Sequence, residues 1–325
     1  MNWLITGGCG FIGTSLIKNL LEQGNEGIRV VDDLSVGSRS ALSAVAPHYY
    51  EGSGRLAPGD VQLLVADILD EEMALAAAEG IDVIVHLAAN TGVQPSIADP
   101  RNDCLTNVIG TLNYLEAARL GKLPRFVFAS SGGTVIGDCA PPVHEELVPH
   151  PKSPYGASKS AGEGYLSAYH GSFGLEGVAL RFGNVYGPGS SHKNSVVARF
   201  VRRAMAGEPL EIYGDGRQTR DYIFIRDLVA AIRLAATTPG VGGKVFQIAT
   251  GCETTVNELA EMLIPILASR GFDAQVRHAA PLPGEIRRNF ADTSRARELL
   301  GWSPRTALAK GLEETVDWFL NDARQ

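Results

Sequence analysis

The glycine-rich stretch ITGGCGFIG, residues 5–13, constrains the fold of this chain more strongly than its composition does. It follows the short apolar run NWLIT and opens a helical pattern, FIGTSLIKNLLEQG. Gly7, Gly10 and Gly13 permit a tight turn and a close backbone approach, while the helix N-terminus offers amide donors and a partial positive charge. A strand, a glycine turn and a helix in this order predict a binding site for the pyrophosphate of a dinucleotide.

The rest of the first half alternates short apolar runs with helical patterns. Apolar runs lie at 27–32, 61–67, 82–88, 125–130 and 176–182, and a helical pattern covers 107–121. Nearly continuous apolar runs are typical of strands buried on both faces. We therefore predict an α/β fold, a Rossmann-type doubly wound parallel sheet with a smaller C-terminal substrate-binding domain. The dinucleotide-binding domain should cover 1–180, with a return near 218–250, and the substrate-binding domain mainly 181–325.

Composition narrows the function classes. The 325 residues are 45% hydrophobic and carry a net charge of −7, which fits a globular protein and disfavours nucleic acid or membrane partners. The four cysteines are scattered, and His144 in HEEL lacks the second histidine of a zinc motif because position 148 is Val148. We therefore expect no metal site. No signal peptide or apolar span is visible in the sequence, so a cytoplasmic location is expected.

Carboxylates after the second strand indicate which dinucleotide binds. Asp32, in VVDDLS, lies nineteen residues beyond Gly13, where a carboxylate binds the hydroxyls of the adenosine ribose. A carboxylate there repels a 2′-phosphate, so NAD is favoured over NADP. Asp67 and Ile68 would border the adenine, and HLAA at 86–89 ends a strand where the cofactor crosses the sheet. Each of these residues taken singly could be a loop cap. The predicted cofactor set also contains Phe11, Ile12, Asp33, Leu87, Ala88, Ala89 and Asn107.

Tyr155 and Lys159 form a candidate acid/base pair. They are four residues apart, so on a helix they share one face. The ammonium, together with a positive nicotinamide ring, would lower the pKa of the tyrosine. Such a tyrosine can take a proton from a sugar hydroxyl as hydride leaves the same carbon. The alternative is an ordinary pair of residues on a surface helix.

Long ordered motifs indicate the family. They are TGGCGFIG, VVDDLS, HLAA, NVIGTLNYLEAAR, SPYGASK, LRFGNVYGPG, YGDGRQTRDYIFIRDL, PGEIRRNFADTSRARELLGW and GLEETVDWF. Over essentially its whole length the chain resembles the extended short-chain dehydrogenase/reductase family, and within it the NAD-dependent nucleotide-sugar (UDP-glucose) 4-epimerases.

The resemblance implies bound NAD, a UDP-sugar substrate and a homodimer. It implies that Tyr155 is the acid/base and that Lys159 also touches the nicotinamide ribose. Asn184 and Arg220 would hold the diphosphate, with Asp221 supporting Arg220. The base pocket would be lined by Val196, Ile212 and Tyr213, and Asn289 would face C2 of the sugar. The subunits would pair through the helices at 107–119 and 159–173.

The chain departs from the family pattern at two positions. Gly132 stands where most members have Ser or Thr, and Leu282 stands where an arginine often holds the diphosphate. For the missing hydroxyl we rank Ser131 first, then Thr134, then a water, with Ser130 as a further candidate. Arg287 or Arg288 could replace the missing arginine.

The loop that contains Gly132 favours C4 epimerisation over the other sugar reactions of the family. A 4,6-dehydratase of this family needs an acidic pair at the positions of Gly133 and Thr134, and a decarboxylase usually has Glu at the second. C4 epimerisation needs only reversible hydride transfer and a 4-keto intermediate that turns over in the site. The alternatives are another nucleotide-sugar-modifying enzyme (dehydratase, decarboxylase or reductase) and a non-catalytic NAD-sensing regulator.

Overall fold

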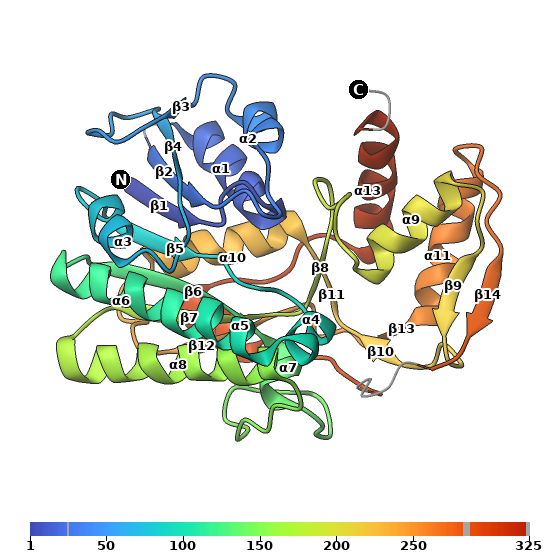
Figure 1. The fold of residues 1–325 in the computed structure, drawn as a ribbon. Coiled ribbons are helices and arrows are strands. Elements are labelled where there is room, and N and C mark those ends of the chain that lie inside the picture. The colour runs from blue at the N-terminus through green and yellow to red at the C-terminus, as the bar shows by residue number, and fades with distance from the viewer. Residues whose placement is uncertain (25, 282–286, 323–325) are drawn as a thin grey trace.

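An eight-stranded parallel sheet forms the centre of the larger lobe (Figure 1). The computed structural model describes residues 1–24, 26–281 and 287–322. In the strand order β12-β7-β6-β5-β1-β2-β4-β3, every neighbouring pair is parallel. The strands are β1 (Asn2–Thr6), β2 (Gly27–Asp32), β3 (Tyr50–Glu51), β4 (Val61–Val65), β5 (Val83–His86), β6 (Arg125–Ser131), β7 (Gly177–Phe182) and β12 (Val245–Ile248). The order runs outward in both directions from β1 and β5, so the predicted doubly wound fold is confirmed.

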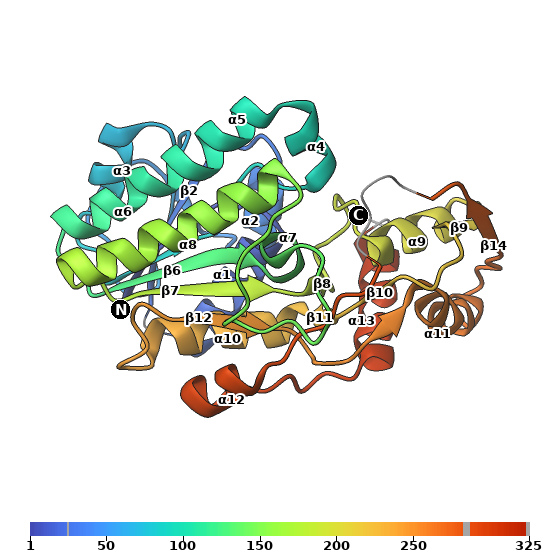
Figure 2. The ribbon, with the colours of Figure 1, turned by 90° about the horizontal axis from the view of Figure 1, so that it is seen from below.

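Helices cover both faces of this sheet (Figures 1 and 2). One layer contains α1 (Phe11–Gln23), α2 (Arg39–Val45) and α10 (Ile225–Thr237); the other contains α3 (Glu71–Ala77), α5 (Pro100–Cys104), the π-helical η1 (Leu105–Ile109), α6 (Gly110–Leu120) and α8 (Pro154–Phe173). Successive strand residues serve opposite layers, as the pleat requires. Trp3 and Ile5 lie in the core beneath α1, whereas Leu4 lies in the core beneath α6. The two layers of helices bury both faces of the sheet, which explains why the strands are nearly continuous apolar runs.

The smaller lobe consists of short strand pairs and helices (right side of Figure 1). The chain enters it through β8 (Asn184–Tyr186), which pairs with β11 (Tyr222–Phe224). Two further pairs are β9 (Leu210–Tyr213) with β14 (Val276–Ala279) and β10 (Thr219–Arg220) with β13 (Thr254–Thr255). The helices of this part are α9 (Val196–Met205), α11 (Val256–Ala268) and α13 (Leu308–Asp322); α12 (Ser294–Leu300) packs back against β12.

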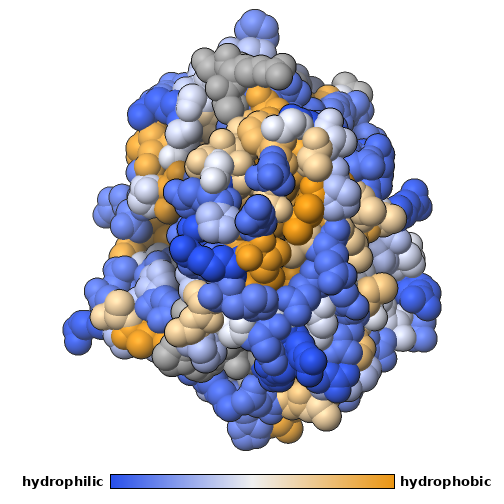
Figure 3. Space-filling model, turned by 90° about the vertical axis from the view of Figure 1, so that its right-hand side faces the viewer, coloured by the Kyte–Doolittle hydropathy of each residue, from blue (hydrophilic) through white to orange (hydrophobic). Residues whose placement is uncertain are grey.

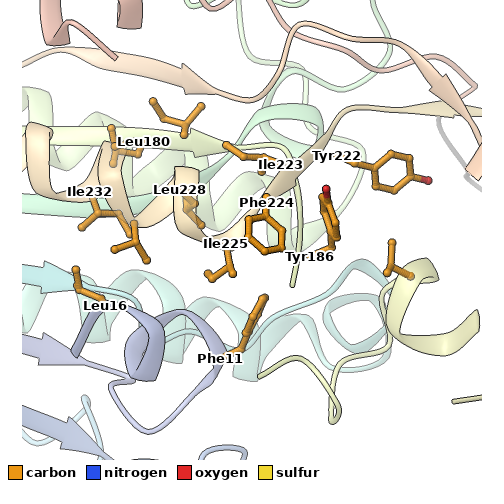
Figure 4. Close-up of a cluster of buried hydrophobic side chains, with 14 of the residues drawn as sticks. Phe11, Leu16, Leu180, Tyr186, Tyr222, Ile223, Phe224, Ile225, Leu228 and Ile232 are labelled. Atoms are coloured by element: carbon orange, nitrogen blue, oxygen red, sulfur yellow. The ribbon is translucent and has the colours of Figure 1, made fainter. Parts of the chain in front are cut away.

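An apolar cluster joins the two lobes (Figure 4). Phe11 from α1 lies near Tyr186 of β8 and Phe224 of β11, and the two latter rings meet edge to face with centroids 5.5 Å apart. The chain returns from the smaller lobe through α10 to β12, which is the edge strand of the large sheet. Seen end-on, the smaller lobe is mostly hydrophilic with a hydrophobic band in its middle (Figure 3). In the part of the chain that the structure describes, no helix is both long and apolar enough to span a bilayer.

Three short elements close the carboxyl edge of the sheet. They are α4 (Val93–Ala98) after β5, α7 (Gly132–Ile136) after β6, and the first turn of α8. Ser153 caps α8 by accepting a hydrogen bond from the amide of Gly156, and Pro154 occupies the first turn, where its missing N–H costs nothing. This edge is where ligands bind in doubly wound sheets.

Candidate active site

The glycine turn after β1 has the geometry that its sequence predicts. Gly7 has a φ of 68°, and a Cβ there would lie 2.8 Å from the amide nitrogen of Ala88. A Cβ at Gly13 would lie 2.5 Å from the Cα of Gly8. Helix α1 starts after Gly10 without a side-chain cap and without an acidic residue in its first turn. The first amides of α1 are therefore left to an anionic ligand, and Phe11 and Ile12 stand beside them.

Asp32 ends β2 directly beside this turn. Its two carboxylate oxygens accept hydrogen bonds from the amides of Cys9 and Leu34, both at 2.9 Å. Burial nevertheless raises the pKa of this carboxyl group. Its neighbour Asp33 points outward and accepts from the amide and hydroxyl of Ser35.

The other predicted cofactor residues border the same edge. Ala88 donates to the hydroxyl of Thr6 at 3.2 Å, which fixes the segment with Leu87 and Ala89 that follows β5. Asp67 accepts from the amide of Leu69. Ile68 is buried against Gly110, where a Cβ would lie 2.5 Å from its Cδ1.

Asn107 is a buried connector. Its Oδ1 accepts from the amide of Asn90 at 2.7 Å, and its Nδ2 lies within hydrogen-bond distance of Asn90, Asp103 and Ser158. It ties the loop after β5 to helix α8, so it positions the cofactor edge through the backbone. A direct contact between Asn107 and the cofactor stays a prediction.

Tyr155 and Lys159 face the sheet from the first turns of α8. The Lys159 nitrogen lies 5.9 Å from the centroid of the Tyr155 ring and 4.9 Å from that of Phe128. Burial lowers the pKa of Lys159 to about 8, although the carboxylates of Asp103 and Glu163 act in the opposite direction. Burial also raises the pKa of Tyr155 to about 12. In the protein without cofactor the pKa of Tyr155 is therefore raised, and its lowering by Lys159 together with a positive nicotinamide ring stays a prediction.

The hydroxyl groups near Gly132 differ in availability. Ser130 donates to Glu163 at 2.5 Å, and Glu163 also accepts two hydrogen bonds from Arg181, so Ser130 is held in a buried network. Thr134 has a buried hydroxyl oxygen with no partner among the described residues. Ser131, the last residue of β6, lies where the strand ends and α7 begins.

Two joined cavities lie at this edge. One, of about 350 Å³, is lined by Ser131, Gly132, Thr134, Gln247 and Asn289 among others. The second, of about 410 Å³, is lined by residues that include Phe11, Ile12, Tyr155, Lys193 and Tyr213. The residues that line both cavities are Ser131, Phe182, Gly183, Asn184 and Arg220.

The predicted substrate residues divide into two groups. Asn184, Arg220, Val196, Tyr213 and Asn289 all line one or both cavities. The side chain of Ile212 does not: it is fully buried in the main core. Residues of β9 alternate between faces, so Tyr213 faces the cavity and its neighbour Ile212 faces away.

Asp221 has a different contact set from the one expected. Its oxygens accept hydrogen bonds from the amide and hydroxyl of Thr250 and from the amides of Gly251 and Ala291. Burial raises the pKa of this carboxyl group. Asp221 therefore fixes the loop after β12 rather than serving mainly as a partner of Arg220.

The two candidate replacements for the missing arginine are engaged elsewhere. Arg287 forms a two-pronged ion pair with Asp215, and Arg288 forms one with Glu253. Leu282 lies outside the described residues.

Lys193, Arg199 and Gln247 are among the cavity-lining residues that were not predicted from the sequence. Lys193 and Arg199 line the larger cavity, and the guanidinium of Arg199 lies 4.8 Å from the centroid of Tyr213. Burial lowers the pKa of Lys193. Gln247 lines the smaller cavity from β12. Lys193 stands in the stretch SSHKNS, residues 190–195, whereas Arg199 lies on α9 and Gln247 lies on β12, the strand VFQI, which was not predicted from the sequence.

The fold and this edge together define a dinucleotide-dependent enzyme of the extended short-chain dehydrogenase/reductase class. The sequence pattern described as the NAD dependent epimerase/dehydratase family matches residues 3–249, and the chain belongs to that family. The family prediction is thereby confirmed.

Individual relatives match over the whole chain. It is 39% identical over 328 residues to a UDP-glucose 4-epimerase of Mycolicibacterium smegmatis, covering 100% of both chains. The structure of a UDP-glucose 4-epimerase of Thermotoga maritima with UDP-glucose matches with a TM-score of 0.89 at 36% identity, covering 99% of this chain and 100% of that one. A UDP-glucuronic acid 4-epimerase of Bacillus cereus, in complex with UDP-glucuronic acid and NAD, matches with a TM-score of 0.87 at 30% identity and covers 99% of each chain.

Proposed function

We propose that this chain catalyses the NAD-dependent epimerisation of a UDP-sugar at C4 through a 4-keto intermediate. The observation that carries this proposal is the position of Tyr155, which lines the larger cavity together with Phe11 and Ile12 and has the Lys159 nitrogen 5.9 Å from its ring centroid. The smaller cavity, lined by Gly132, joins it. The similarity to UDP-sugar 4-epimerases over the full chain supports it.

The residues at the glycine turn fit NAD. Gly7 and Gly13 form a cradle that any Cβ would fill, and the uncapped start of α1 would receive the pyrophosphate. Asp32 would bind the ribose hydroxyls with the lone pairs that Cys9 and Leu34 leave free. Bound NAD would supply the acceptor for the hydride of C4 of the sugar and the donor that gives it back to the keto carbon.

Tyr155 is the proposed acid and base. Its phenol oxygen would remove the proton of the 4-hydroxyl as the keto group forms and would return it afterwards. The Lys159 ammonium favours the phenolate, since an opposite charge stabilises the ionised form. Phe128 packs beneath Lys159 and keeps that nitrogen away from bulk water.

The larger cavity would hold the UDP part of the substrate. Arg220 and Asn184 stand where the two cavities meet, so a diphosphate between sugar and uridine would reach both. Val196 and Tyr213 would line the base pocket. Lys193 adds a further cation, and no carboxylate acts on its pKa among the described residues.

The smaller cavity favours epimerisation over dehydration. Dehydration needs a side-chain acid and base that move protons between C5 and C6 of the sugar. The lining of the described cavity contains one carboxylate, Asp221, and its oxygens already accept from Thr250, Gly251 and Ala291. Gly133 and Thr134 supply no acid. An exchange at C4 needs none beyond Tyr155.

The experiment is a panel of UDP-sugars incubated with the purified holoenzyme and analysed for C4 epimers by NMR. We expect interconversion of at least one C4 pair. Tyr155→Phe should abolish turnover and leave NAD bound, because only the proton carrier is lost. Near-wild-type turnover in that variant would remove Tyr155 from this role, and a 4-keto-6-deoxy product would indicate a dehydratase instead.

We further propose that two chains pair through η1, α6 and α8. Large apolar side chains are exposed along these helices: Leu105, Ile109, Leu120, Tyr165 and Phe173. Exposed apolar groups on adjacent helices are typical of an interface between subunits.

A further inference from the structure

Gln247 is a buried glutamine with an unused amide at the wall of the smaller cavity. It lies on β12, opposite Arg181 of β7, and its side chain is 1% exposed. Its neighbours Phe246 and Ile248 face the main core, so the pleat directs Gln247 to the other face. The Nε2 atom has no hydrogen-bond partner among the described residues. A buried polar atom without a partner costs stability, and at the wall of a cavity such an atom points to a ligand.

The position of this amide depends on Gly132. A Cβ at position 132 would lie 2.8 Å from Oε1 of Gln247, which is closer than real Cβ contacts allow. The amide thus occupies the space of a side chain at 132, which would fit only if the end of the Gln247 side chain moved. Gly132 and Gln247 line the same cavity as Ser131 and Asn289.

We propose that the carboxamide of Gln247 takes the place of a side-chain hydroxyl at position 132 and hydrogen-bonds a hydroxyl of the substrate sugar. A carboxamide can accept from a hydroxyl and donate to a keto oxygen, and half a turn of the amide exchanges its two polar atoms. Gln247 therefore suits a carbon that alternates between alcohol and ketone. This inference rests on the proposed function, because it places a sugar in the smaller cavity.

The test compares the affinities of the NAD-bound protein for a UDP-sugar and for UDP by calorimetry. Gln247→Met keeps the length of the side chain and removes both polar atoms. We expect it to weaken the UDP-sugar roughly three- to tenfold and to leave UDP within about twofold of wild type, because UDP has no sugar. Gln275→Met, the same change at an exposed residue before β14, is the matched control.

A pair of compensating variants tests the exchange with Gly132. Gly132→Ser should weaken the UDP-sugar because its side chain collides with the amide. Gly132→Ser combined with Gln247→Ala should bind better than Gly132→Ser alone, since it removes the collision and supplies a hydroxyl. Thermal unfolding and NAD content show whether each variant is folded.

Three results would overturn the inference: wild-type UDP-sugar affinity in Gln247→Met, a parallel loss of UDP affinity, or a double variant no better than Gly132→Ser. Failure of the proposed epimerase reaction would give different results from failure of the Gln247 proposal. A wild type that binds UDP-sugars without turning them over refutes the epimerase and leaves these affinities to decide on Gln247. A wild type that binds no UDP-sugar refutes both.

Discussion

At the scale of single residues, the site contains charged and polar groups that reduce the stability of the protein. Lys159 is 3% exposed, and its lowered pKa shows that burial disfavours the ammonium more than Asp103 and Glu163 favour it. Thr134 and Gln247 each have a buried atom without a partner among the described residues. Such costs at one edge of an otherwise well-packed sheet are typical of a ligand site.

Lys159→Met should therefore stabilise the NAD-free protein at neutral pH. The pKa of Lys159 is about 8 in the folded protein and near the ordinary value of 10.5 in the unfolded chain. Between these two values the unfolded chain binds a proton that the folded protein does not, so stability falls as the pH falls from 10.5 to about 8. The variant should raise the free energy of unfolding at pH 7 by about 1–3 kcal/mol, since one pKa unit corresponds to about 1.4 kcal/mol. It should also flatten the rise in stability between pH 8 and 10. Denaturant unfolding of both proteins measures this, with the exposed Lys18→Met as control; a less stable Lys159→Met would contradict it.

Asn289 is expected to determine whether a 2-acetamido sugar fits. A Cβ at Gly133 would lie 1.9 Å from Nδ2 of Asn289, so the glycine leaves the space that this amide occupies. A tyrosine at 289 would fill the cavity where the acetamido group would lie. Asn289→Tyr should then reduce turnover of UDP-N-acetylglucosamine more than turnover of UDP-glucose. Steady-state kinetics on both substrates decides this, and equal losses would reject the role of Asn289 as a gate.

At the scale of elements, the loop before α9 brings Lys193 to the larger cavity, which we call the nucleotide cavity because it would hold UDP. Arg202 of α9 donates to the carbonyl oxygens of Ser191 and Lys193, which fixes this loop over the cavity. The amide of Lys193 donates to Ser190 at 2.9 Å, so the backbone is held from both sides. A fixed loop presents the Lys193 ammonium with little loss of conformational entropy on binding.

Lys193→Met should weaken the binding of UDP more than the binding of uridine. A charge-assisted hydrogen bond to phosphate contributes about 1.5–3 kcal/mol, so the affinity for UDP should fall about ten- to a hundredfold. Uridine, which has no phosphate, should bind as before. Calorimetry with both ligands measures the difference, and Arg220→Ala should show a similar selective loss. Lys244→Met, at a half-buried lysine beside β12 and away from the nucleotide cavity, is the matched control. If Lys193→Met lost NAD and kept UDP affinity, the cation would belong to the cofactor instead.

The sequence predicted the elements with strong periodicity and missed those set by tertiary contacts. The buried strands and the helices α1, α6 and α8 follow from their apolar period and their caps. The short edge strand β12 was missed because four residues carry little periodic signal. Its pairing with β7 is a contact between distant parts of the chain.

In the candidate site, too, the sequence predicted the residues of local motifs and missed the contacts between distant parts of the chain. Motif positions such as Gly7, Asp32, Tyr155 and Lys159 are local in sequence, and the structure brings them to one edge. The contact between Gly132 and Gln247 spans more than a hundred residues, so no local pattern predicts it. The side of β9 from which Ile212 projects depends on the register of this strand, and a shift by one residue would reverse it.

At the scale of the whole molecule, the net charge of −7 contrasts with the cations at the nucleotide cavity. Lys193, Arg199 and Arg220 line that cavity, and Arg202 supports it. A local positive field in an acidic protein steers anionic ligands to one place. The affinity for UDP should therefore fall as salt rises, while that for uridine should not.

The proposed dimer connects the outer surface of the molecule with its site. Helix α8 carries Tyr155 and Lys159 at its start and the exposed Tyr165 and Phe173 further along. A partner packed on this helix would hold it rigid. Ile109→Glu and Tyr165→Glu should each give monomers, because a buried unpaired carboxylate is costly in an apolar interface.

Size-exclusion chromatography with light scattering gives the mass of each variant at micromolar concentration. Met262→Glu, the same type of change at an exposed residue of α11 in the smaller lobe, should leave the dimer intact. A monomeric wild type would contradict the dimer, and dissociation by Met262→Glu alone would place the interface on the other lobe. Because the proposed interface residues Ile109 and Tyr165 line neither cavity, the monomeric variants should keep their UDP affinity. A loss of turnover in them would then show that pairing holds α8, and with it Tyr155, in its working position.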